Sequence, residues 1–454
     1  MARPPRAVFV TLAVMLTLPT ALVGAAGAQA VPGRSQSGTG TTPAPLVLPP
    51  AKTEGVAPTS TGVQKALAAV MADSSLGKHH GVYVYDASRG KALASIGTAK
   101  PFVPASTMKL LTTISALATI GADHWFTTET VSPSRGSVIL VGGGDPLLAL
   151  RPTTEFPARA TLQELATSTA QSLRSQGVAS VTLGYDANLF TGPAANAKWE
   201  PNYVTEGIAA RTSALWVNEG RVSPGMAKRA PSPALAAATA FAGLLRTAGI
   251  KVTGSFKPVD APATADGLAQ VRSASLGDIV EYINLHSDND GAEVLLRQVG
   301  IATDNGGSYT GGVKGLRATL AKLGIDVTKA QIYDGSGLSR ANQVPLEALA
   351  GAVRVAVTKP ELRHLLSGLP IAGFTGSLED RFAGPGSEPG TGIVRAKTGT
   401  LTGVHSLAGL ARDRTGTILV FAVATDSAPP DKALAARAAL DRITAILASC
   451  GCAG

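Results

Sequence analysis

The sequence predicts an α/β (α+β) protein with a central antiparallel sheet flanked by helices, plus a large, mainly β-rich insertion. Two observations predict this architecture. The last quarter of the chain reads as three short strands joined by tight turns and closed by a helix, and residues 81–96 read as a hairpin near the other end. Three consecutive antiparallel strands closed by a terminal helix, together with the hairpin near the N-terminus, suggest one sheet built from both ends of the chain. Between them, residues 129–265 change to a pattern of short strands and turns interrupted by two helices, and we expect them to form the insertion.

Composition narrows the class of protein. The chain has 454 residues, 45% hydrophobic and 16% charged, which excludes a mainly disordered chain. Lys+Arg 40 against Asp+Glu 31 gives a net charge of +9, which fits attraction to polyanions or acidic surfaces. With 4% aromatic residues and no aromatic-interleaved Lys/Arg block, nucleic-acid binding is disfavoured.

Cys450 and Cys452 are the two cysteines of the chain. Two cysteines exclude both a disulfide scaffold and a cysteine-based zinc cage. A bridge between them closes a very small ring, so the sequence leaves open a bridge, a terminal thiol pair and an intermolecular link.

The N-terminus reads as a secretory signal over residues 1–30. Two arginines precede an apolar run, Val8–Ala26, which ends in Ala28-Gln-Ala30, a small-x-small cleavage site. The alternative is an uncleaved anchor helix, since the run approaches spanning length. Residues 31–60, rich in Pro, Gly, Ser and Thr, predict a flexible tether. We therefore expect an exported protein, in the periplasm, cell wall or extracellular space, without a stable transmembrane span after cleavage near Ala30.

The other elements follow in order. A helix over 63–72 precedes strands over 81–86 and 91–96 and an apolar helix over 106–120, which we expect to be buried centrally. The insertion combines short strands, at 137–141 and 181–185 among others, with helices over 162–175 and 233–248. A helical pattern covers 276–299, and strands over 392–400, 404–411 and 417–425 precede a helix over 431–447. The main domain is thus expected to be discontinuous (61–128 and 266–454), and we expect the insertion to carry no catalytic group.

With few histidines, the candidate nucleophile is a serine served by a lysine three residues later on a helix. The spacing occurs three times, but Ser75–Lys78 ends a helix and Ser88–Lys91 spans a turn. Ser106-Thr-Met-Lys109 alone opens a buried helix, where burial lowers the pKa of a lysine. The structural alternative is a capping serine with a snorkelling lysine.

The sequence contains two further motifs that could act together with Ser106-Thr-Met-Lys109. Ser287-Asp-Asn289 is the single Ser-x-Asn, in a helical pattern interrupted at Asp290-Gly291, and the alternative interpretation is a polar turn. Lys397-Thr-Gly399 is the single Lys-[Ser/Thr]-Gly, on a predicted strand where the alternative is an ordinary edge lysine. Gly399 would let a substrate backbone lie close to that strand.

The three motifs in this order resemble the penicillin-recognising serine transpeptidase superfamily, whose three-motif signature is well known. The 177 residues between Lys109 and Ser287 resemble the class C low-molecular-mass penicillin-binding proteins, the D-alanyl-D-alanine carboxypeptidase/endopeptidase family. Three more segments are similar to that family over residues 60–450: Gly142–Pro146, Asp334–Ser339, and Leu369–Leu378 followed by Arg381.

The resemblance implies a transpeptidase/β-lactamase-like fold and a role for each motif residue. Ser106 would be the acylated nucleophile and Lys109 its general base, while Ser287, held by Lys397, would pass protons to the leaving amine. The remaining roles concern substrate binding: Asn289 on the peptide backbone of the acyl donor, Thr398 and Thr400 on the terminal carboxylate, and the backbone N–H groups of Ser106 and Thr400 as the oxyanion hole.

The implied substrates are peptidoglycan stem peptides ending in D-Ala-D-Ala, with β-lactams as covalent inhibitors. No cofactor, metal ion or nucleic acid is expected. His79-His80 is interpreted as a solvated turn in preference to a metal pair.

Two rival functions stay open at this point. A β-lactamase or esterase on the same scaffold would need a base for the deacylating water, but Glu200-Pro-Asn202 has the wrong spacing for the Glu-x-x-x-Asn pattern of class A enzymes. A non-catalytic cell-wall-binding protein predicts decay of a motif, and all three are intact.

Overall fold

The computed structural model describes residues 56–453. The predicted signal peptide (1–30) and most of the predicted tether (31–60) lie outside the described residues. The helices are α1 (Ser60–Met71), α2 (Met108–Ile120), α3 (Leu162–Ser175), α4 (Pro233–Thr247), α5 (Leu276–His286), α6 (Asn289–Ala302), α7 (Tyr309–Lys322), α8 (Leu346–Thr358), α9 (His364–Ser367) and α10 (Ala433–Ala448).

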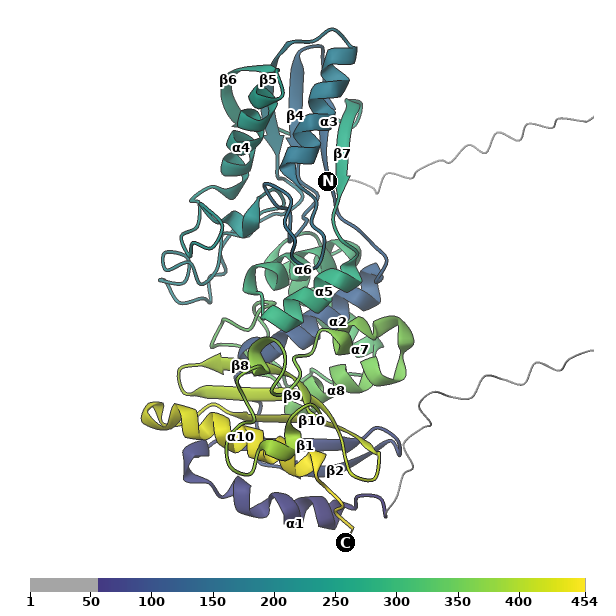
Figure 1. Cartoon of the computed structure of the whole chain (residues 1–454), viewed down its shortest axis with the longest axis vertical. Coiled ribbons are helices and arrows are strands. Elements are labelled where there is room, and N and C mark those ends of the chain that lie inside the picture. The colour runs from purple at the N-terminus through teal and green to yellow at the C-terminus, as the bar shows by residue number, and fades with distance from the viewer. Residues whose placement is uncertain (1–55, 454) are drawn as a thin grey trace, which may run out of the picture. The chain divides into compact units, whose positions relative to one another are not determined.

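The first sheet confirms the expectation that both ends of the chain meet. Its order is β2-β1-β10-β9-β8, and every neighbouring pair is antiparallel. The strands are β1 (His80–Asp86), β2 (Lys91–Ile96), β8 (Arg395–Leu401), β9 (Val404–Arg412) and β10 (Ile418–Thr425). β8 therefore lies at an edge, with one side free of a neighbouring strand (Figure 1).

Two apolar layers cover this sheet (Figure 1). On one face α1 and α10 pack through residues such as Leu67, Leu440 and Ile443. On the other, α2 lies among α5 to α8, and residues such as Leu110 and Ile114 pack with the sheet residues Ala408 and Val420. The predicted central burial of α2 is confirmed, because every residue from Met108 to Leu117 is buried.

A second five-stranded sheet comes from the middle of the chain, in the order β6-β5-β4-β3-β7. It contains β3 (Thr127–Ser132), β4 (Ser137–Val141), β5 (Ser180–Asp186), β6 (Lys251–Pro258) and β7 (Asp266–Arg272). The pairs β4–β5 and β5–β6 are parallel and the others antiparallel, and α3 and α4 share an apolar cluster with this sheet. The second sheet extends beyond 129–265, because β3 begins at Thr127 and its partner β7 (Asp266–Arg272) lies entirely after that range.

Three of the element boundaries that differ from the sequence prediction lie at the motifs. The helix expected from Ser106 begins as a 3-10 turn, Ala105–Thr107, and becomes α-helical at Met108. The helical pattern over 276–299 breaks at Ser287-Asp288, not at Asp290-Gly291. The strand expected from Gly392 begins at Arg395.

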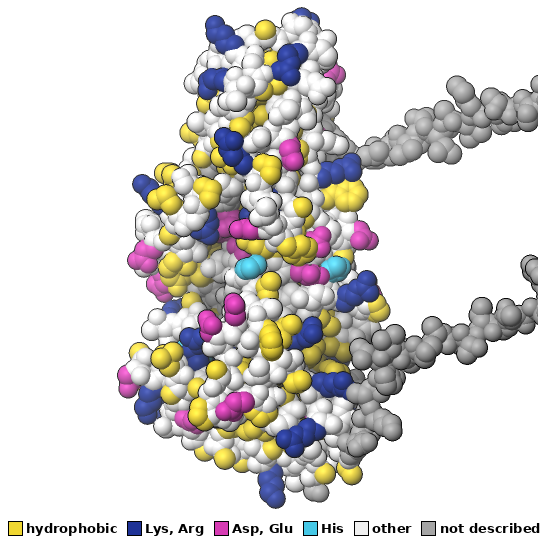
Figure 2. Space-filling model, in the orientation of Figure 1, with side chains coloured by type: hydrophobic (Ala, Val, Ile, Leu, Met, Phe, Trp, Pro, Cys, Tyr) yellow, Lys and Arg dark blue, Asp and Glu magenta, His cyan; other side chains and the backbone are white. Residues whose placement is uncertain are grey.

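The described surface carries mixed charge. On the face in Figure 2, Lys and Arg side chains are scattered and do not form one block. No helix within residues 56–453 combines the length and hydropathy needed to cross a membrane.

The two cysteines form a Cys450–Cys452 disulfide just after α10. The Cys452 carbonyl accepts a hydrogen bond from the Thr59 backbone N–H at 2.9 Å, at the start of α1. The bridge therefore lies where the end of α10 meets the start of α1.

Candidate active site

The three sequence motifs come together at the edge strand β8. Ser106 lies in the 3-10 turn before α2, and Lys109 lies one turn later on α2. Ser287 and Asn289 flank the break between α5 and α6, and Lys397 lies in β8. Each pair of motifs is linked by a side-chain hydrogen bond or by close backbone contact.

Lys109 is the centre of this arrangement. Its side chain is fully buried, and its Nζ lies 2.9 Å from Ser106 Oγ, 2.7 Å from Asn289 Oδ1 and 2.8 Å from the Ser336 carbonyl oxygen. An ammonium group has three donors, and all three are used here. The amide oxygen and the carbonyl oxygen can only accept, so when the amine is neutral its two N–H groups are directed to them. Its lone pair is then left facing Ser106 Oγ.

Burial lowers the pKa of Lys109 to about 8. Four buried or half-buried carboxyl groups oppose that shift and favour the ammonium form: Asp288, Glu293, Asp334 and Asp290. A lysine with this pKa is partly neutral near physiological pH, which a general base requires.

Lys397 holds the second serine. Its Nζ is fully buried and donates to Ser287 Oγ at 2.8 Å and to the Thr398 carbonyl at 3.0 Å. Burial, followed by the positive charge of Lys109, lowers the pKa of Lys397 well below its usual value. The two lysines thus serve different hydroxyl groups, Lys109 that of Ser106 and Lys397 that of Ser287.

The Ser287-Asp-Asn289 segment owes its shape to two helix ends. Ser287 ends α5 in the left-handed conformation, with φ 59°. The Asp288 carboxylate caps α6 by accepting from the backbone N–H groups of Asp290 and Gly291. This break turns both the Ser287 and the Asn289 side chains toward the lysines, which a continuous helix would not do at a spacing of two residues.

The remaining predicted residues lie on β8. The Thr398 hydroxyl donates to Ser377 Oγ at 2.7 Å, and Thr400 is exposed opposite His405. The fold itself requires glycine at 399, because a Cβ there would lie 2.6 Å from the Pro104 carbonyl and 3.1 Å from the Ser106 backbone nitrogen. The close approach at Gly399 is made by the protein's own nucleophile turn.

The sequence analysis missed several groups that hold the motif residues. The Ser336 backbone carbonyl accepts from Lys109, and the Ile208 backbone carbonyl accepts from Asn289 Nδ2 at 3.3 Å. Because a backbone carbonyl is present at every residue, the sequence gives no signal for either contact. Glu293 accepts from the backbone N–H groups of Gly335 and Ser336. Its signal was present, since Glu293 follows Asn289 by four residues on one helix face.

Two of the three additional family-like segments contact motif residues. The loop Asp334–Ser339 supplies the Ser336 carbonyl, and Leu369–Leu378 supplies Ser377. Arg381 pairs with Asp441 of α10 at 2.5 Å, and the carbonyls of Gly143 and Gly144 accept from Gln298 on α6. The loop Asp334–Ser339 and the segment Leu369–Leu378 therefore support motif residues directly.

The other two Ser-x-x-Lys sequences lie elsewhere. Ser75 is in a short 3-10 turn and Ser88 is in the turn between β1 and β2. Neither serine is hydrogen-bonded to its lysine among the interactions of the described residues. The interpretation of His79-His80 as a solvated turn is wrong: His79 stacks on Phe102 and binds Asp426 at 2.6 Å, and both His80 ring nitrogens contact backbone carbonyls.

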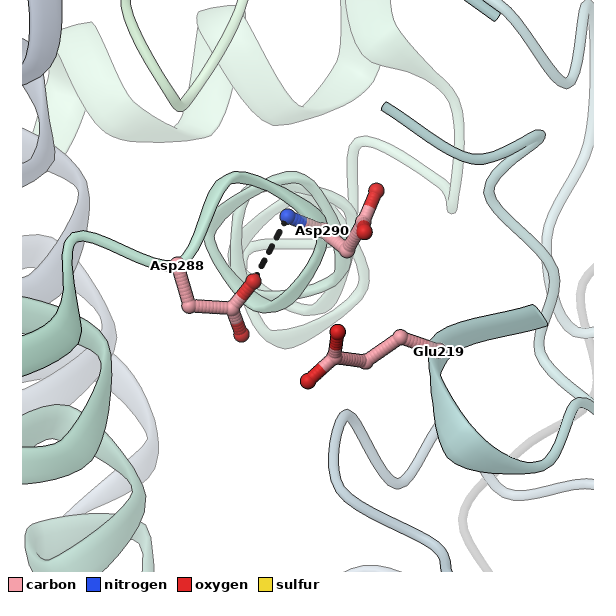
Figure 3. Close-up of side chains that lie close together, drawn as sticks. All are labelled: Glu219, Asp288 and Asp290. Atoms are coloured by element: carbon pink, nitrogen blue, oxygen red, sulfur yellow. Dashed lines mark hydrogen bonds between the residues drawn. The ribbon is translucent and has the colours of Figure 1, made fainter. Parts of the chain in front are cut away.

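Three carboxyl groups meet beside the Ser287-Asp-Asn289 segment (Figure 3). Glu219, Asp288 and Asp290 each bring an oxygen within 4.8 Å of the others. Glu219 comes from residues 129–265, and so does Arg229, whose Nη2 lies 2.6 Å from Asp290 Oδ2. The middle segment therefore contacts the residues next to the motif.

The chain is similar to known carboxypeptidases over most of its length. The model of the D-Ala-D-Ala carboxypeptidase 3 (S13) family matches residues 63–232 and 225–447. A carboxypeptidase of Mycobacterium tuberculosis is 35% identical over 429 residues, covering 90% of each chain. A D-alanyl-D-alanine carboxypeptidase of an Actinomadura species is 29% identical over 434 residues, covering 77% of this chain and 78% of the relative.

A crystal structure of penicillin binding protein 4 from Haemophilus influenzae has a similar fold. Its TM-score is 0.70 at 21% identity, and the match covers 86% of this chain and 99% of that one. The same protein in complex with a β-lactam matches with a TM-score of 0.63 and covers 86% of this chain.

Proposed function

The chain belongs to the D-Ala-D-Ala carboxypeptidase 3 (S13) family, and from this premise we propose how its own residues carry out the reaction. It is a serine-type D-Ala-D-Ala carboxypeptidase/endopeptidase of the class C low-molecular-mass penicillin-binding proteins. The observation that carries the assignment of residues is the Lys109 Nζ, 2.9 Å from Ser106 Oγ, with its two other hydrogen-bonding directions occupied by groups that only accept.

In the proposed acylation step, neutral Lys109 takes the Ser106 proton as Oγ attacks the carbonyl carbon of the penultimate D-Ala. The backbone N–H groups of Ser106 and Thr400 stabilise the negative charge on the carbonyl oxygen. The Ser287 hydroxyl, held by Lys397, donates a proton to the nitrogen of the departing D-Ala. The Oγ–carbonyl bond forms as the peptide bond breaks, and free D-Ala leaves.

Substrate binding and deacylation complete the proposal. Asn289 would hydrogen-bond the peptide backbone of the acyl donor, and the Thr398 and Thr400 hydroxyl groups would contact the terminal carboxylate, Thr398 by exchanging its Ser377 partner. Water then attacks the acyl-enzyme and releases the shortened peptide. The proposed substrates are stem peptides ending in D-Ala-D-Ala, or cross-linked peptides when the enzyme acts as an endopeptidase.

Labelling with benzylpenicillin tests the choice of nucleophile. A β-lactam mimics D-Ala-D-Ala, and its opened ring does not depart, so the acyl-enzyme persists. Mass spectrometry should find one adduct per chain, on Ser106. A label on Ser75 or Ser88 would show that another Ser-x-x-Lys carries the nucleophile.

Stopped-flow acylation of three variants tests the division of roles. Lys109→Ala should slow acylation by about 10² to 10⁴, the usual size of a general-base contribution. Lys397→Ala should also slow it, because Ser287 loses the donor that holds its hydroxyl group. Asn289→Ala should reduce peptide turnover in a folded protein. Near wild-type acylation by Lys109→Ala, together with an inactive Lys397→Ala, would make Lys397 the base.

Digestion of defined muropeptides separates the two activities. Release of free D-Ala means carboxypeptidase action, and conversion of dimers to monomers means endopeptidase action.

We also propose that the protein is exported and that its mature form begins at Val31. The Ala28-Gln-Ala30 site after an apolar run supports this. Sequencing the N-terminus of the secreted or envelope fraction tests it, and finding Met1 or Ala2 there would favour an anchor instead.

A further inference from the structure

Glu219, Asp288 and Asp290, which we call the acidic cluster, lie directly beside two motif residues (Figure 3). Asp288 is the chain neighbour of both Ser287 and Asn289. Its two carboxylate oxygens accept from the backbone at 2.9 and 3.0 Å, and these bonds hold the break between α5 and α6. Any force that moves the Asp288 carboxylate therefore moves Ser287 and Asn289 as well.

Three carboxyl groups this close repel one another when they are ionised. Burial raises the pKa of Asp288 well above its usual value, and the charges of Glu219 and Asp290 raise it further. Burial also raises the pKa of Asp290 to about 6, and Arg229 opposes that rise. The cluster thus needs a cation to stay ionised in its present geometry.

Arg229 supplies that cation from inside the protein. Its guanidinium is almost fully buried, with Nη2 2.6 Å from Asp290 Oδ2 and Nη1 3.8 Å from Glu219 Oε2. Nη1 also donates to the Glu219 backbone carbonyl at 2.9 Å. Arg221 pairs with the same Glu219 carboxylate at 3.1 Å, but its side chain is 30% exposed against 3% for Arg229.

We propose that Arg229 is a positioning residue for the serine peptidase reaction: by neutralising the acidic cluster it keeps Asp288 in place, and through Asp288 it keeps Ser287 and Asn289 aligned with the two active-site lysines. Because Arg229 already supplies the positive charge, the three carboxyl groups form an ion-pair network and not a metal site. This inference rests on the proposed function of Ser287 and Asn289, and it gives the middle segment of the chain a part in the reaction.

The proposal predicts a pH-dependent defect. Without Arg229 the carboxyl groups stay protonated to a higher pH, and repulsion appears as they ionise. The other titratable or charged groups that face the cluster are Lys109, Arg221, Tyr282, His286 and Arg159. Arg229→Met leaves all of these side chains in place. The defect should therefore grow as the pH rises.

The experiment measures benzylpenicillin acylation rates of the full chain at pH 5.5 and 7.5. Arg229→Met should acylate about 10- to 100-fold more slowly than wild type at pH 7.5, the cost of a small misplacement of reacting groups. At pH 5.5 the deficit should shrink markedly. Arg221→Met is the matched control, because it removes a more exposed partner of the same carboxylate, and its rate should stay within about threefold.

Two further variants separate positioning from a general loss of packing. Arg229→Lys keeps the charge and should recover most of the rate. Arg229→Met/Asp290→Asn removes one charge of each sign and should recover part of it, and this double variant also serves if Arg229→Met alone does not fold. An equal deficit at both pH values, or no recovery in either variant, would overturn the proposal, as would wild-type acylation by Arg229→Met.

Failure of this inference is distinguishable from failure of the proposed function. If wild type itself forms no penicillin adduct on Ser106, the proposed function fails. If wild type is labelled on Ser106, and Arg229→Met is labelled as fast as wild type at pH 5.5 and at pH 7.5, only the role of Arg229 fails.

Discussion

At the scale of single residues, the chemistry depends on what surrounds one amine. Lys109 is buried, which disfavours its charged ammonium form. Carboxyl groups in the first turns of α6, at its N-cap and in the loop Asp334–Ser339 offset part of this cost. The balance leaves the pKa of Lys109 at about 8. Glu293 acts on this balance in two ways, through its charge and through the backbone N–H groups that it holds at Gly335 and Ser336.

The first prediction concerns the pH dependence of acylation. The rate should rise with pH up to about 8, because only neutral Lys109 accepts the Ser106 proton. Burial raises the pKa of Glu293 to about 8, so this carboxyl group ionises in the same pH range as Lys109. Glu293→Gln removes the negative charge that the ionised carboxylate supplies to the ammonium, so the pKa of Lys109 should fall and the acid limb should move to lower pH by up to about one unit. Stopped-flow rates between pH 5 and 9 measure this shift.

Thr112→Val is the matched control for Glu293→Gln. The Thr112 hydroxyl donates to the Gly335 carbonyl at 2.7 Å, so the substitution disturbs the same loop without changing charge. It should slow acylation at every pH and leave the limb where it is. Equal profiles for the two variants would mean that Glu293 acts only by holding the loop.

At the scale of elements, the nucleophile turn depends on close contact with a neighbouring loop. Ala105, immediately before Ser106, has a positive φ of 46°. Its carbonyl oxygen lies against Gly337, where a Cβ would come within 1.8 Å of it. Gly337 itself has φ +85°, so both space and backbone conformation require glycine. The start of α2 is thus shaped by the loop Asp334–Ser339.

The second prediction follows from this contact. Gly337→Ala should force the Ala105 carbonyl away, slow acylation by about tenfold or more and cost about 1–3 kcal/mol in the free energy of unfolding. Gly324→Ala is the control, because Gly324 also has a positive φ (+71°) but nothing lies within 4 Å of its Cβ position. It should cost about 1 kcal/mol and leave acylation unchanged. Normal acylation by a folded Gly337→Ala would contradict the expected role of the contact.

At the scale of the whole molecule, the middle segment reaches the site at several points. We expected residues 129–265 to carry no catalytic group, and none of the three motifs lies there. Nevertheless Trp199 Nε1 donates to Asp334 Oδ2 at 3.0 Å, and the Ile208 carbonyl accepts from Asn289. We propose that residues 129–265 are an appended module that carries no catalytic group but contacts residues of the site and its supporting loop.

The third prediction tests the Trp199 contact. Trp199→Phe keeps the aromatic packing but leaves Asp334 without one donor, so the free energy of unfolding should fall by about 1–3 kcal/mol. Acylation should slow by a few-fold, because Asp334 anchors the loop that supplies the Ser336 carbonyl to Lys109. Denaturant unfolding and penicillin acylation measure the two effects.

Trp125→Phe is the comparison for Trp199→Phe. Trp125 is 45% exposed and packs on Arg272, so its substitution should change stability by about 0.5 kcal/mol or less. If the two variants lost equal stability, the buried hydrogen bond to Asp334 would have no special weight.

Local pattern was enough to predict the first sheet, the buried α2 and the three motifs. Strand alternation, tight turns and helical periodicity are properties of neighbouring residues, and the Ser106–Lys109 spacing shares a helix face whatever the rest of the chain does. The pairing of β1 with β2 and of β8, β9 and β10 in sequence followed from local hairpin patterns and the preference for short connections, whereas the pairing of β1 with β10 was not predicted.

Tertiary packing decided the rest, because the groups concerned come from segments far apart in sequence or from the backbone itself. The Ser336 carbonyl orients Lys109 across 227 residues, and the Ile208 carbonyl reaches Asn289 across 81. Gly399 is required by the turn at Pro104–Ser106, and the helix break falls at Ser287-Asp288 because the Asp288 carboxylate caps α6. Such contacts depend on how burial and charge balance in the assembled fold, and residue types along the chain do not encode that balance locally.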